Sequence, residues 1–227
     1  MYNKILSFFD YDKNEKLMCN IKKNIFLFIK RIGDIIFSII GIFLIIPLMA
    51  IVKVINMLHG DHESIFYSHE RIGKNGKIFK LYKFRTMVPD ADKILEEMLK
   101  EEKYKNEWDL NQKFKNDPRI TKIGNFLRKT SLDEFPQFLN IIKGDMSLIG
   151  PRPLIKGELI SHGGNSKMYE SVKPGLTGWW ACNGRNDLSY DERLELEYYY
   201  VNNKSLKLDA ECIYRTVKAV ASKKGAK

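Results

Sequence analysis

Residues 35–52 read IIFSIIGIFLIIPLMAIV, an 18-residue run with no charged side chain between Asp34 and Lys53. A run of this length and hydrophobicity is typical of a membrane segment, although a core helix buried on all sides gives a similar pattern. A cleaved signal peptide fits less well, because 34 residues precede the run and no small-residue cleavage site follows it. The run therefore predicts a membrane helix, which we place at residues 30–60.

Pro47 lies within this run and argues against a simple span. At about 1.5 Å per residue the run reaches about 27 Å, barely a bilayer core, and proline removes a helical hydrogen bond. Residues 1–31 hold seven Lys and Arg side chains against three acidic ones, and the chain after the run is also basic. Both flanks then favour the cytoplasmic side. We predict a re-entrant helix kinked at Pro47; a kinked single-pass helix is the alternative.

The composition of the 227 residues is that of a globular protein, with 44% hydrophobic and 29% charged residues. The excess of 38 Lys and Arg over 28 Asp and Glu, a net charge of +10, predicts an anionic partner such as nucleic acid, acidic lipid or a phosphorylated substrate. Cys19, Cys182 and Cys212 are too far apart for a zinc ribbon or a disulfide framework. We expect an extension at 1–29, the membrane helix, one domain at 61–222 and a tail at 223–227.

The domain has the pattern of a helix-dominated mixed α/β fold with a small β-hairpin. Strands are expected at about 64–68 and 78–84, joined by a turn at Asn75-Gly76. A helix begins near Pro89-Asp90, and two more are expected at 188–201 and 205–222.

Residues 116–153, NDPRITKIGNFLRKTSLDEFPQFLNIIKGDMSLIGPRP, contain the densest pattern of polar and turn residues. Ser131 to Glu134 fits a capping box, but Ser131 as N-cap would place Pro136 at the fifth helical position, where an N–H is needed. With Asp133 as N-cap, the proline falls at the third position, where none is needed. We therefore predict a helix that starts after Asp133 and is capped at its end by Gly144.

Asp133 and Glu134 would then lie at a helix start, which attracts anions, and adjacent carboxylates there can divide their roles between binding a metal and attacking phosphorus. Arginine suits bidentate phosphate contacts, although each arginine singly is also a common surface charge. Five arginines stand around this pair, several of them in rigid or turn-rich contexts: Arg85, Arg119, Arg128, Arg152 and Arg185.

A series of motifs extends from about residue 30 to residue 217. It comprises Lys30-Arg31 and Asp34, Pro47, Arg71-x-Gly73, Gly76, Tyr82 to Met87, Asp117 to Thr121, Phe126 to Glu134, Pro136-Gln137, Gly144 to Ser147, Gly150 to Pro153, Lys173 to Gly175 and Asn183-Gly184-Arg185. In this order the motifs resemble the monotopic phosphoglycosyl transferases, also called bacterial sugar transferases.

The resemblance implies a catalytic domain on the cytoplasmic face of the bacterial inner membrane, among membrane phospholipids. It implies transfer of a sugar 1-phosphate from a UDP-sugar to polyprenol (undecaprenyl) phosphate with release of UMP, as the first membrane step of polysaccharide or glycan assembly. Mg²⁺ is the implied cofactor. The stretch 184–193 is similar to that of members using UDP-galactose or UDP-glucose, which favours a hexose donor.

By position, the resemblance implies that Asp133 is the nucleophile and Glu134 its magnesium-associated partner, so both are candidate metal ligands. Arg128 and Arg152 are the implied diphosphate contacts. Three further phosphate contacts are expected: Lys83, Arg85 and Arg185.

Some positions depart from the family pattern. Ile46 stands where a serine often precedes the membrane proline, Ala181 and Cys182 replace a common glutamine and valine, and Glu197 fills a position usually held by aspartate.

Two rival functions stay open on the sequence. One is a membrane-tethered basic binding protein, but no nucleic-acid-binding motif supports it, so we expect no nucleic acid partner. The other is a non-catalytic adaptor, against which the intact Asp133-Glu134 pair argues. His59, Asp61 and His62 fit a solvated loop better than a metal site, because further ligands are missing.

Overall fold

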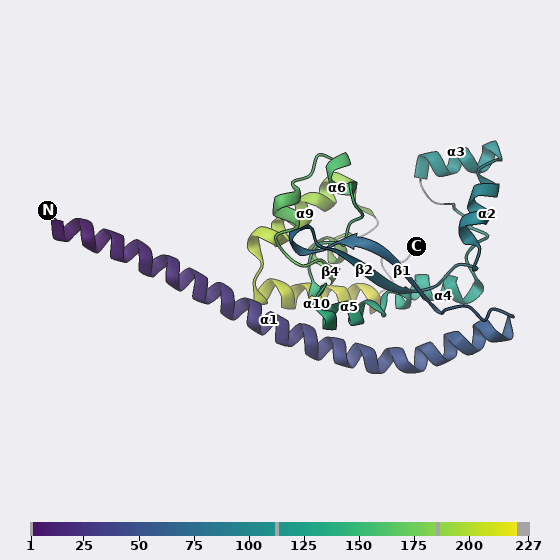
Figure 1. Cartoon of the computed structure of the whole chain (residues 1–227), viewed down its shortest axis with the longest axis horizontal. Coiled ribbons are helices and arrows are strands. Elements are labelled where there is room, and N and C mark those ends of the chain that lie inside the picture. Colours follow the sequence, from purple (N-terminus) through teal and green to yellow (C-terminus); the bar gives the residue numbers. More distant parts are fainter. Residues whose placement is uncertain (1, 112–113, 185–186, 222–227) are drawn as a thin grey trace.

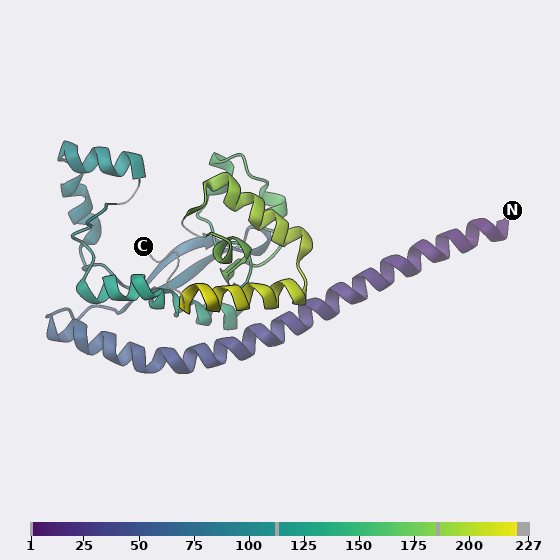
Figure 2. The same cartoon turned by 180° about the vertical axis from the view of Figure 1, so that it is seen from behind.

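The computed structural model describes the backbone of residues 2–111, 114–184 and 187–221, and side chains within 17–18, 20–109, 114–184 and 187–219. Its first element, α1 (Tyr2–Leu58), is one helix of 57 residues that holds the whole apolar run. Its N-terminal part projects away from the rest of the chain, while its C-terminal part passes along it in a gentle curve (Figures 1 and 2). The helix can extend this far because it contains no glycine before Gly33 and no proline other than Pro47, and these two residue types disfavour helix most strongly.

One face of α1 packs on the domain. Buried residues recur at helical spacing along this face, at Asp34, Ser38, Gly41, Ile45, Val52 and Asn56. At Gly41 the approach is close, since a Cβ there would lie 2.4 Å from the ring of Phe138. The other faces expose apolar side chains such as Ile36 and Phe43. Within the described residues this is the one helix long and apolar enough to cross a membrane.

The predicted hairpin is present as the antiparallel strands β1 (Phe66–Ile72) and β2 (Ile78–Phe84). The turn between them is a short 3₁₀ segment, η1 (Lys74–Gly76), in which Asn75 and Gly76 both have positive φ. The bounds of the second strand are confirmed. The prediction for the first strand was wrong by two to four residues, because the polar residues at 68–71 hide a strand that runs the full length of β2.

Helices α2 (Ala91–Met98) and α3 (Glu102–Asn111) form an arm that stands away from the rest of the domain (Figure 1). The chain returns through α4 (Lys122–Thr130), which starts at Thr121, whose hydroxyl accepts a hydrogen bond from the N–H of Gly124. Gly124 packs against the backbone of Thr86, where a Cβ would lie 2.0 Å from the carbonyl oxygen. This contact fixes α4 beside the end of β2.

The segment after α4 corrects the sequence prediction. Ser131 ends α4 in the left-handed conformation with φ +57°, and Asp133 lies inside a 3₁₀ turn, η2 (Leu132–Glu134), instead of capping a helix. The next helix, α5 (Gln137–Lys143), starts directly after Pro136, which itself needs no donor. The 3₁₀ bonds from the N–H groups of Glu134 and Phe135 account for the turn. Gly144, with φ +88°, ends α5 as predicted.

The C-terminal half adds a parallel strand pair that the sequence did not predict, β3 (Ser147–Ile149) with β4 (Gly175–Thr177). Three short helices belong to this half of the chain: α6 (Glu158–Ser161) and α7 (Ser166–Tyr169) between the two strands, and α8 (Trp179–Cys182) after β4. The two predicted C-terminal helices are present as α9 (Tyr190–Asn203) and α10 (Leu206–Ala221). The structure is thus the expected helix-dominated mixed α/β fold.

The core is built around β2. On one side, Phe84 packs with Ile45 and Val52 of α1 and with Leu127 of α4. On the other, Phe79 and Leu81 pack with Ile141 of α5 and Met146. Because α1, α4 and α5 all meet this strand, the side chains of β2 are held in fixed positions relative to the loop at 131–136.

Candidate active site

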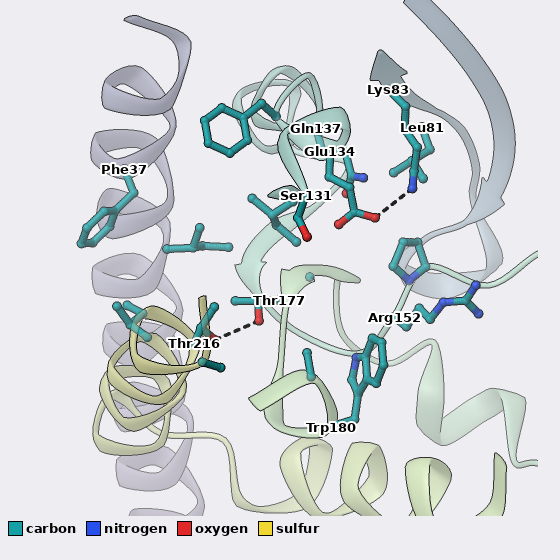
Figure 3. A pocket seen from close by; sticks show the side chains of 18 of the residues that line it. Phe37, Leu81, Lys83, Ser131, Glu134, Gln137, Arg152, Thr177, Trp180 and Thr216 are labelled. Atoms are coloured by element: carbon teal, nitrogen blue, oxygen red, sulfur yellow. Dashed lines mark hydrogen bonds and ion pairs between the residues drawn. The ribbon is translucent and has the colours of Figure 1, made fainter. Parts of the chain in front are cut away.

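A cavity of about 540 Å³ opens between α1, β2, the turn after α4, β4, α8 and α10. One side is charged and the other apolar. Figure 3 shows Lys83, Glu134 and Arg152 on one side of the space and Phe37 of α1 and Thr216 of α10 on the other. Further apolar lining comes from Leu148, Leu176, Ile213 and Val217. The cavity therefore fits a molecule with an anionic part and an apolar part.

The two predicted carboxylates are presented by η2 at the charged side. Glu134 lines the cavity, and Asp133 lies beside it with its side chain only 13% exposed. Lys83, near the end of β2, places its Nζ 2.8 Å from Glu134 Oε1 and 3.8 Å from Asp133 Oδ2. One ammonium thus lies within 4 Å of both carboxylates; Figure 3 marks its ion pair with Glu134 by a dashed line.

The environment of Asp133 alters its acidity. Burial raises the pKa of this carboxyl, and the negative charge of Glu134 raises it further, while Lys83 and Arg128 oppose the shift. A carboxylate with a raised pKa is more basic than an exposed one. Such a group suits nucleophilic attack when nearby cations keep it ionised.

Arg128 lies in the last turn of α4 and lines the cavity. Its Nε donates to Thr86 Oγ1 at 2.8 Å, and Thr86 is buried directly after the end of β2. The hydroxyl orients the guanidinium without neutralising it. Arg128 therefore keeps its charge available on the cavity wall.

Arg152 lines the same wall from the Gly150–Pro153 turn. Its Nη1 donates to Glu158 Oε1 at 2.8 Å, and its backbone N–H donates to Glu197 Oε1 at 3.2 Å. Arg71 of β1 also lines the cavity. The sequence contained Arg71 only as part of a motif, and no local signal marked it as a site residue.

Two of the predicted phosphate-binding residues are not found on this wall within the described part of the chain. Arg85 does not line the cavity; its Nη2 lies 2.9 Å from the Asp61 carboxylate and its Nε donates to the carbonyl of Ser64 at 2.7 Å, so it holds the loop that follows α1. Arg185 lies outside the described residues. Pro47 lies inside α1 and the helix continues through it.

Asp133 and Glu134 are the residues that could hold a metal ion here. Mg²⁺ is commonly held by one or two carboxylates together with substrate phosphates and water, so this pair fits it. The position of the Lys83 ammonium between them shows that the local charge favours a cation. Among the described residues no group of three or more His, Cys, Asp or Glu side chains could hold a metal, and this includes the loop with His59 and His62.

His69 of β1 adds information on the charge of the wall. Burial lowers its pKa to about 4, and the neighbouring charges of Arg71, Lys83 and Arg152 lower it further. The imidazole is therefore neutral at physiological pH. The positive charges of Arg71, Lys83 and Arg152 thus act together on this part of β1.

A family described as bacterial sugar transferase matches residues 25–223. The exopolysaccharide production protein ExoY of Sinorhizobium fredii is 42% identical over 198 residues, which cover 87% of each chain. The undecaprenyl-phosphate galactose phosphotransferase of Salmonella typhimurium is 41% identical over 212 residues, 93% of this chain and 44% of that protein.

A third relative is the UDP-glucose:undecaprenyl-phosphate glucose-1-phosphate transferase of Escherichia coli, 35% identical over 206 residues, 83% of this chain and 39% of that protein. The chain thus spans less than half the length of the Salmonella and E. coli relatives, but most of ExoY. The matched region includes both the apolar part of α1 and the cavity.

Proposed function

The chain belongs to the bacterial sugar transferase family, and we propose that it transfers a sugar 1-phosphate from a UDP-sugar to undecaprenyl phosphate with release of UMP. The reaction would be the first membrane step in assembling a polysaccharide or glycan. The observation that carries the proposal is the two-sided cavity, which has Glu134, Lys83, Arg128 and Arg152 on one side and apolar side chains of α1 and α10 on the other. The charged side suits the diphosphate of a nucleotide sugar and the phosphate of the lipid, and the apolar side suits the lipid chain.

In the proposed mechanism, Asp133 Oδ attacks the phosphorus that carries the sugar. The bond from this phosphorus to the bridging oxygen of the diphosphate breaks, UMP leaves with that oxygen, and the sugar phosphate stays on Asp133 as an acyl phosphate. A phosphate oxygen of the lipid then attacks the same phosphorus, and the bond to Asp133 breaks to restore the carboxylate. Two displacements at one carboxylate replace a single harder one.

The other residues act on charge and orientation. Lys83 keeps Asp133 ionised and holds it beside Glu134, while Arg128 and Arg152 neutralise the phosphoryl oxygens as charge develops. Mg²⁺, held by Glu134 and Asp133 together with the diphosphate, would supply further charge neutralisation.

We infer that the protein sits on the cytoplasmic face of the bacterial inner membrane, with α1 entering the bilayer and bending near Pro47 as a re-entrant helix. Two observations support this. Lys30 and Val52, one near each end of the apolar run, both contact the domain, so both ends of the run stay near one side. Between them, Ile36 and Phe43 expose apolar side chains that phospholipid would cover.

The donor is proposed to be UDP-galactose or UDP-glucose, because the relatives that name a sugar name these two hexoses.

The purified full-length chain tests the proposal. With undecaprenyl phosphate and Mg²⁺ it should release UMP from a UDP-hexose, and excess chelator should stop the release. UMP release that is independent of the lipid over many turnovers would indicate a hydrolase instead. A chain that binds UDP-sugars but never releases UMP would be an adaptor without catalysis.

A further inference from the structure

Glu158 is the point on which three distant arginines converge. Its Oε1 lies 2.8 Å from Arg152 Nη1 and 3.5 Å from Arg193 Nη2, and its Oε2 lies 3.8 Å from Arg71 Nη1. The arginines come from the Gly150–Pro153 turn, α9 and β1. Glu158 itself is fixed, since its Oε2 also accepts a hydrogen bond from the N–H of Ile155 at 3.1 Å.

These groups are largely removed from water. The side chains of Glu158, Arg71 and Arg193 are only 12–15% exposed, and that of Arg152 is 35% exposed. Burial and the charge of Arg152 lower the pKa of Arg71, and Glu158 opposes this. Guanidiniums placed this close repel one another, so they need a shared anion to stay together.

This group of arginines is connected to the cavity in two ways. Arg71 and Arg152 line it directly, while Arg193 lies with its guanidinium carbon 5.8 Å from the ring centroid of Trp180, which also lines it. Figure 3 shows the indole of Trp180 near Arg152. Glu158 does not line the cavity. It contacts the lining residues Arg71 and Arg152 directly, and it is linked to Trp180 through Arg193.

We propose that Glu158 is a positioning residue that holds Arg71 and Arg152 in the orientation needed to bind the diphosphate of the nucleotide sugar. This rests on the proposed function for the identity of the anion. Glu158 would act through the arginines without touching substrate, and Arg193 would transmit the same restraint to Trp180.

Removing the charge of Glu158 has opposite effects on anion binding under two possible roles, so the measurement distinguishes them. If Glu158 only offsets positive charge, Glu158→Gln makes the wall more cationic and tightens anion binding. If it positions the arginines, the same substitution releases them and weakens binding. We expect the second effect, a loss of about tenfold to a hundredfold in affinity, the range typical when outer-shell partners of metal ligands are replaced.

The experiment measures the Kd of UDP for the detergent-solubilised full-length chain with Mg²⁺, by calorimetry. Glu195→Gln, an exposed glutamate on α9, is the matched control and should bind UDP as the wild type does. Glu158→Asp keeps the charge but is one methylene shorter, so positioning predicts weakened binding, whereas a role in charge alone predicts wild-type binding. Thermal unfolding of each variant confirms that it is folded.

A double variant separates positioning from a general loss of stability. In an Arg152→Ala background, Glu158→Gln should weaken UDP binding by a much smaller factor than in the wild type, because one arginine it orients is gone. Equal factors in both backgrounds, or UDP binding by Glu158→Gln as tight as wild type, would overturn the inference. UDP binding needs no turnover, so a chain that shows the predicted losses but releases no UMP would refute the proposed function alone.

Discussion

At the scale of single residues, the site depends on how the negative charge of Asp133 is balanced by neighbouring cations. A buried carboxylate next to a second one tends to take up a proton, and both burial and Glu134 push the pKa of Asp133 upwards. Lys83 lies within 4 Å of both acids and opposes this. Asp133 is therefore a carboxylate with a raised pKa that lies close to a cation, as the proposed role of nucleophile requires.

Replacing Asp133 with Asn tests its role as nucleophile. Wild-type enzyme with UDP-sugar and Mg²⁺ but without lipid should release UMP in a burst of at most one equivalent and retain a sugar phosphate on the segment 130–137. Asp133→Asn keeps the size of the side chain but is a poor nucleophile, so both burst and adduct should vanish. Intact-mass spectrometry and UMP detection measure the two outcomes.

The competing mechanism is direct attack by the lipid phosphate on the nucleotide sugar. It predicts no UMP before lipid is added and a partly active Asn variant. An adduct on another residue would displace Asp133 as nucleophile while leaving the transferase activity in place.

The candidate residues that the structure brings together at the cavity were chosen through the motifs that resemble the family. The carboxylate pair and its cations Lys83, Arg128 and Arg152 lie in motifs with a recognisable local pattern. Glu158 and Arg71 were not predicted, because their roles depend on contacts between segments that are far apart in the chain. Arg85 lies in a motif but pairs with Asp61 across a loop, which no local pattern encodes.

At the scale of elements, hydrophobic periodicity and turn residues predicted the long helices and the hairpin. They did not predict the parallel pair β3 and β4, because strands of three residues carry no periodic signal. This pair exists because Gly175 lets two backbones approach: a Cβ there would lie 2.1 Å from the backbone nitrogen of Gly150.

Gly175→Ala should therefore destabilise the fold. The neighbouring atoms are backbone and cannot rotate away, so we expect a loss of about 1–3 kcal/mol in the free energy of unfolding, the range for overpacking. Chemical denaturation of the detergent-solubilised chain measures it. Gly33→Ala is the control, since a Cβ there meets nothing within 4 Å, and it should stabilise α1 by about 0.5–1 kcal/mol. Equal effects of the two substitutions would contradict the packing argument.

Glu197 on α9 should make stability depend on pH. Burial raises its pKa to about 7, against the hydroxyl of Tyr169 and the charges of Arg193 and Arg152. The folded state binds this proton more tightly than the unfolded state, so the stability that protonation provides is lost as the pH rises from about 4.5 to about 7.

In Glu197→Gln this loss should be absent. Melting temperatures measured at about pH 4 and about pH 8, on either side of this range, should differ less in the variant than in the wild type, with the variant the more stable at the higher pH. Glu195→Gln on the exposed face of α9 should leave the wild-type pH dependence unchanged. An identical pH dependence in Glu197→Gln would show that the buried carboxyl does not titrate in this range.

At the scale of the whole molecule, the relation of α1 to the domain limits how the chain can meet a membrane. Lys30 Nζ is 2.7 Å from Asp209 Oδ2, Asp34 Oδ1 accepts from the N–H of Leu148 at 2.8 Å, and Val52 is fully buried in the core. From Lys30 to Val52 the helix spans about 33 Å at 1.5 Å per residue, roughly the thickness of a bilayer core. A single span would separate the ends that these contacts hold against one domain.

The prediction of a re-entrant helix from sequence rests on the proline and the basic flanks, and the sequence carries no information on what α1 contacts. The ion pair of Lys30 with Asp209 joins residues that are 179 positions apart. The buried Asp34 would be costly without the hydroxyl of Ser147 and the N–H of Leu148. Only the folded chain shows that these two polar residues, which precede the apolar run, are partnered by the domain.

Cysteine labelling in intact cells tests this topology. In a background with the three native cysteines replaced by alanine, a cysteine at position 10 and one at the exposed Lys93 should both resist a membrane-impermeant maleimide and react after the membrane is permeabilised. Substituting Pro47 with Leu restores the helical hydrogen bond and should shift a fraction of the chains towards a spanning helix, which exposes position 10 to the reagent. Lys93→Cys should stay protected in that variant because the domain does not cross. Labelling of position 10 from outside in the chain that retains Pro47 would make α1 a single-pass helix, and the contacts of Lys30 and Asp34 with the domain could not then exist in the membrane.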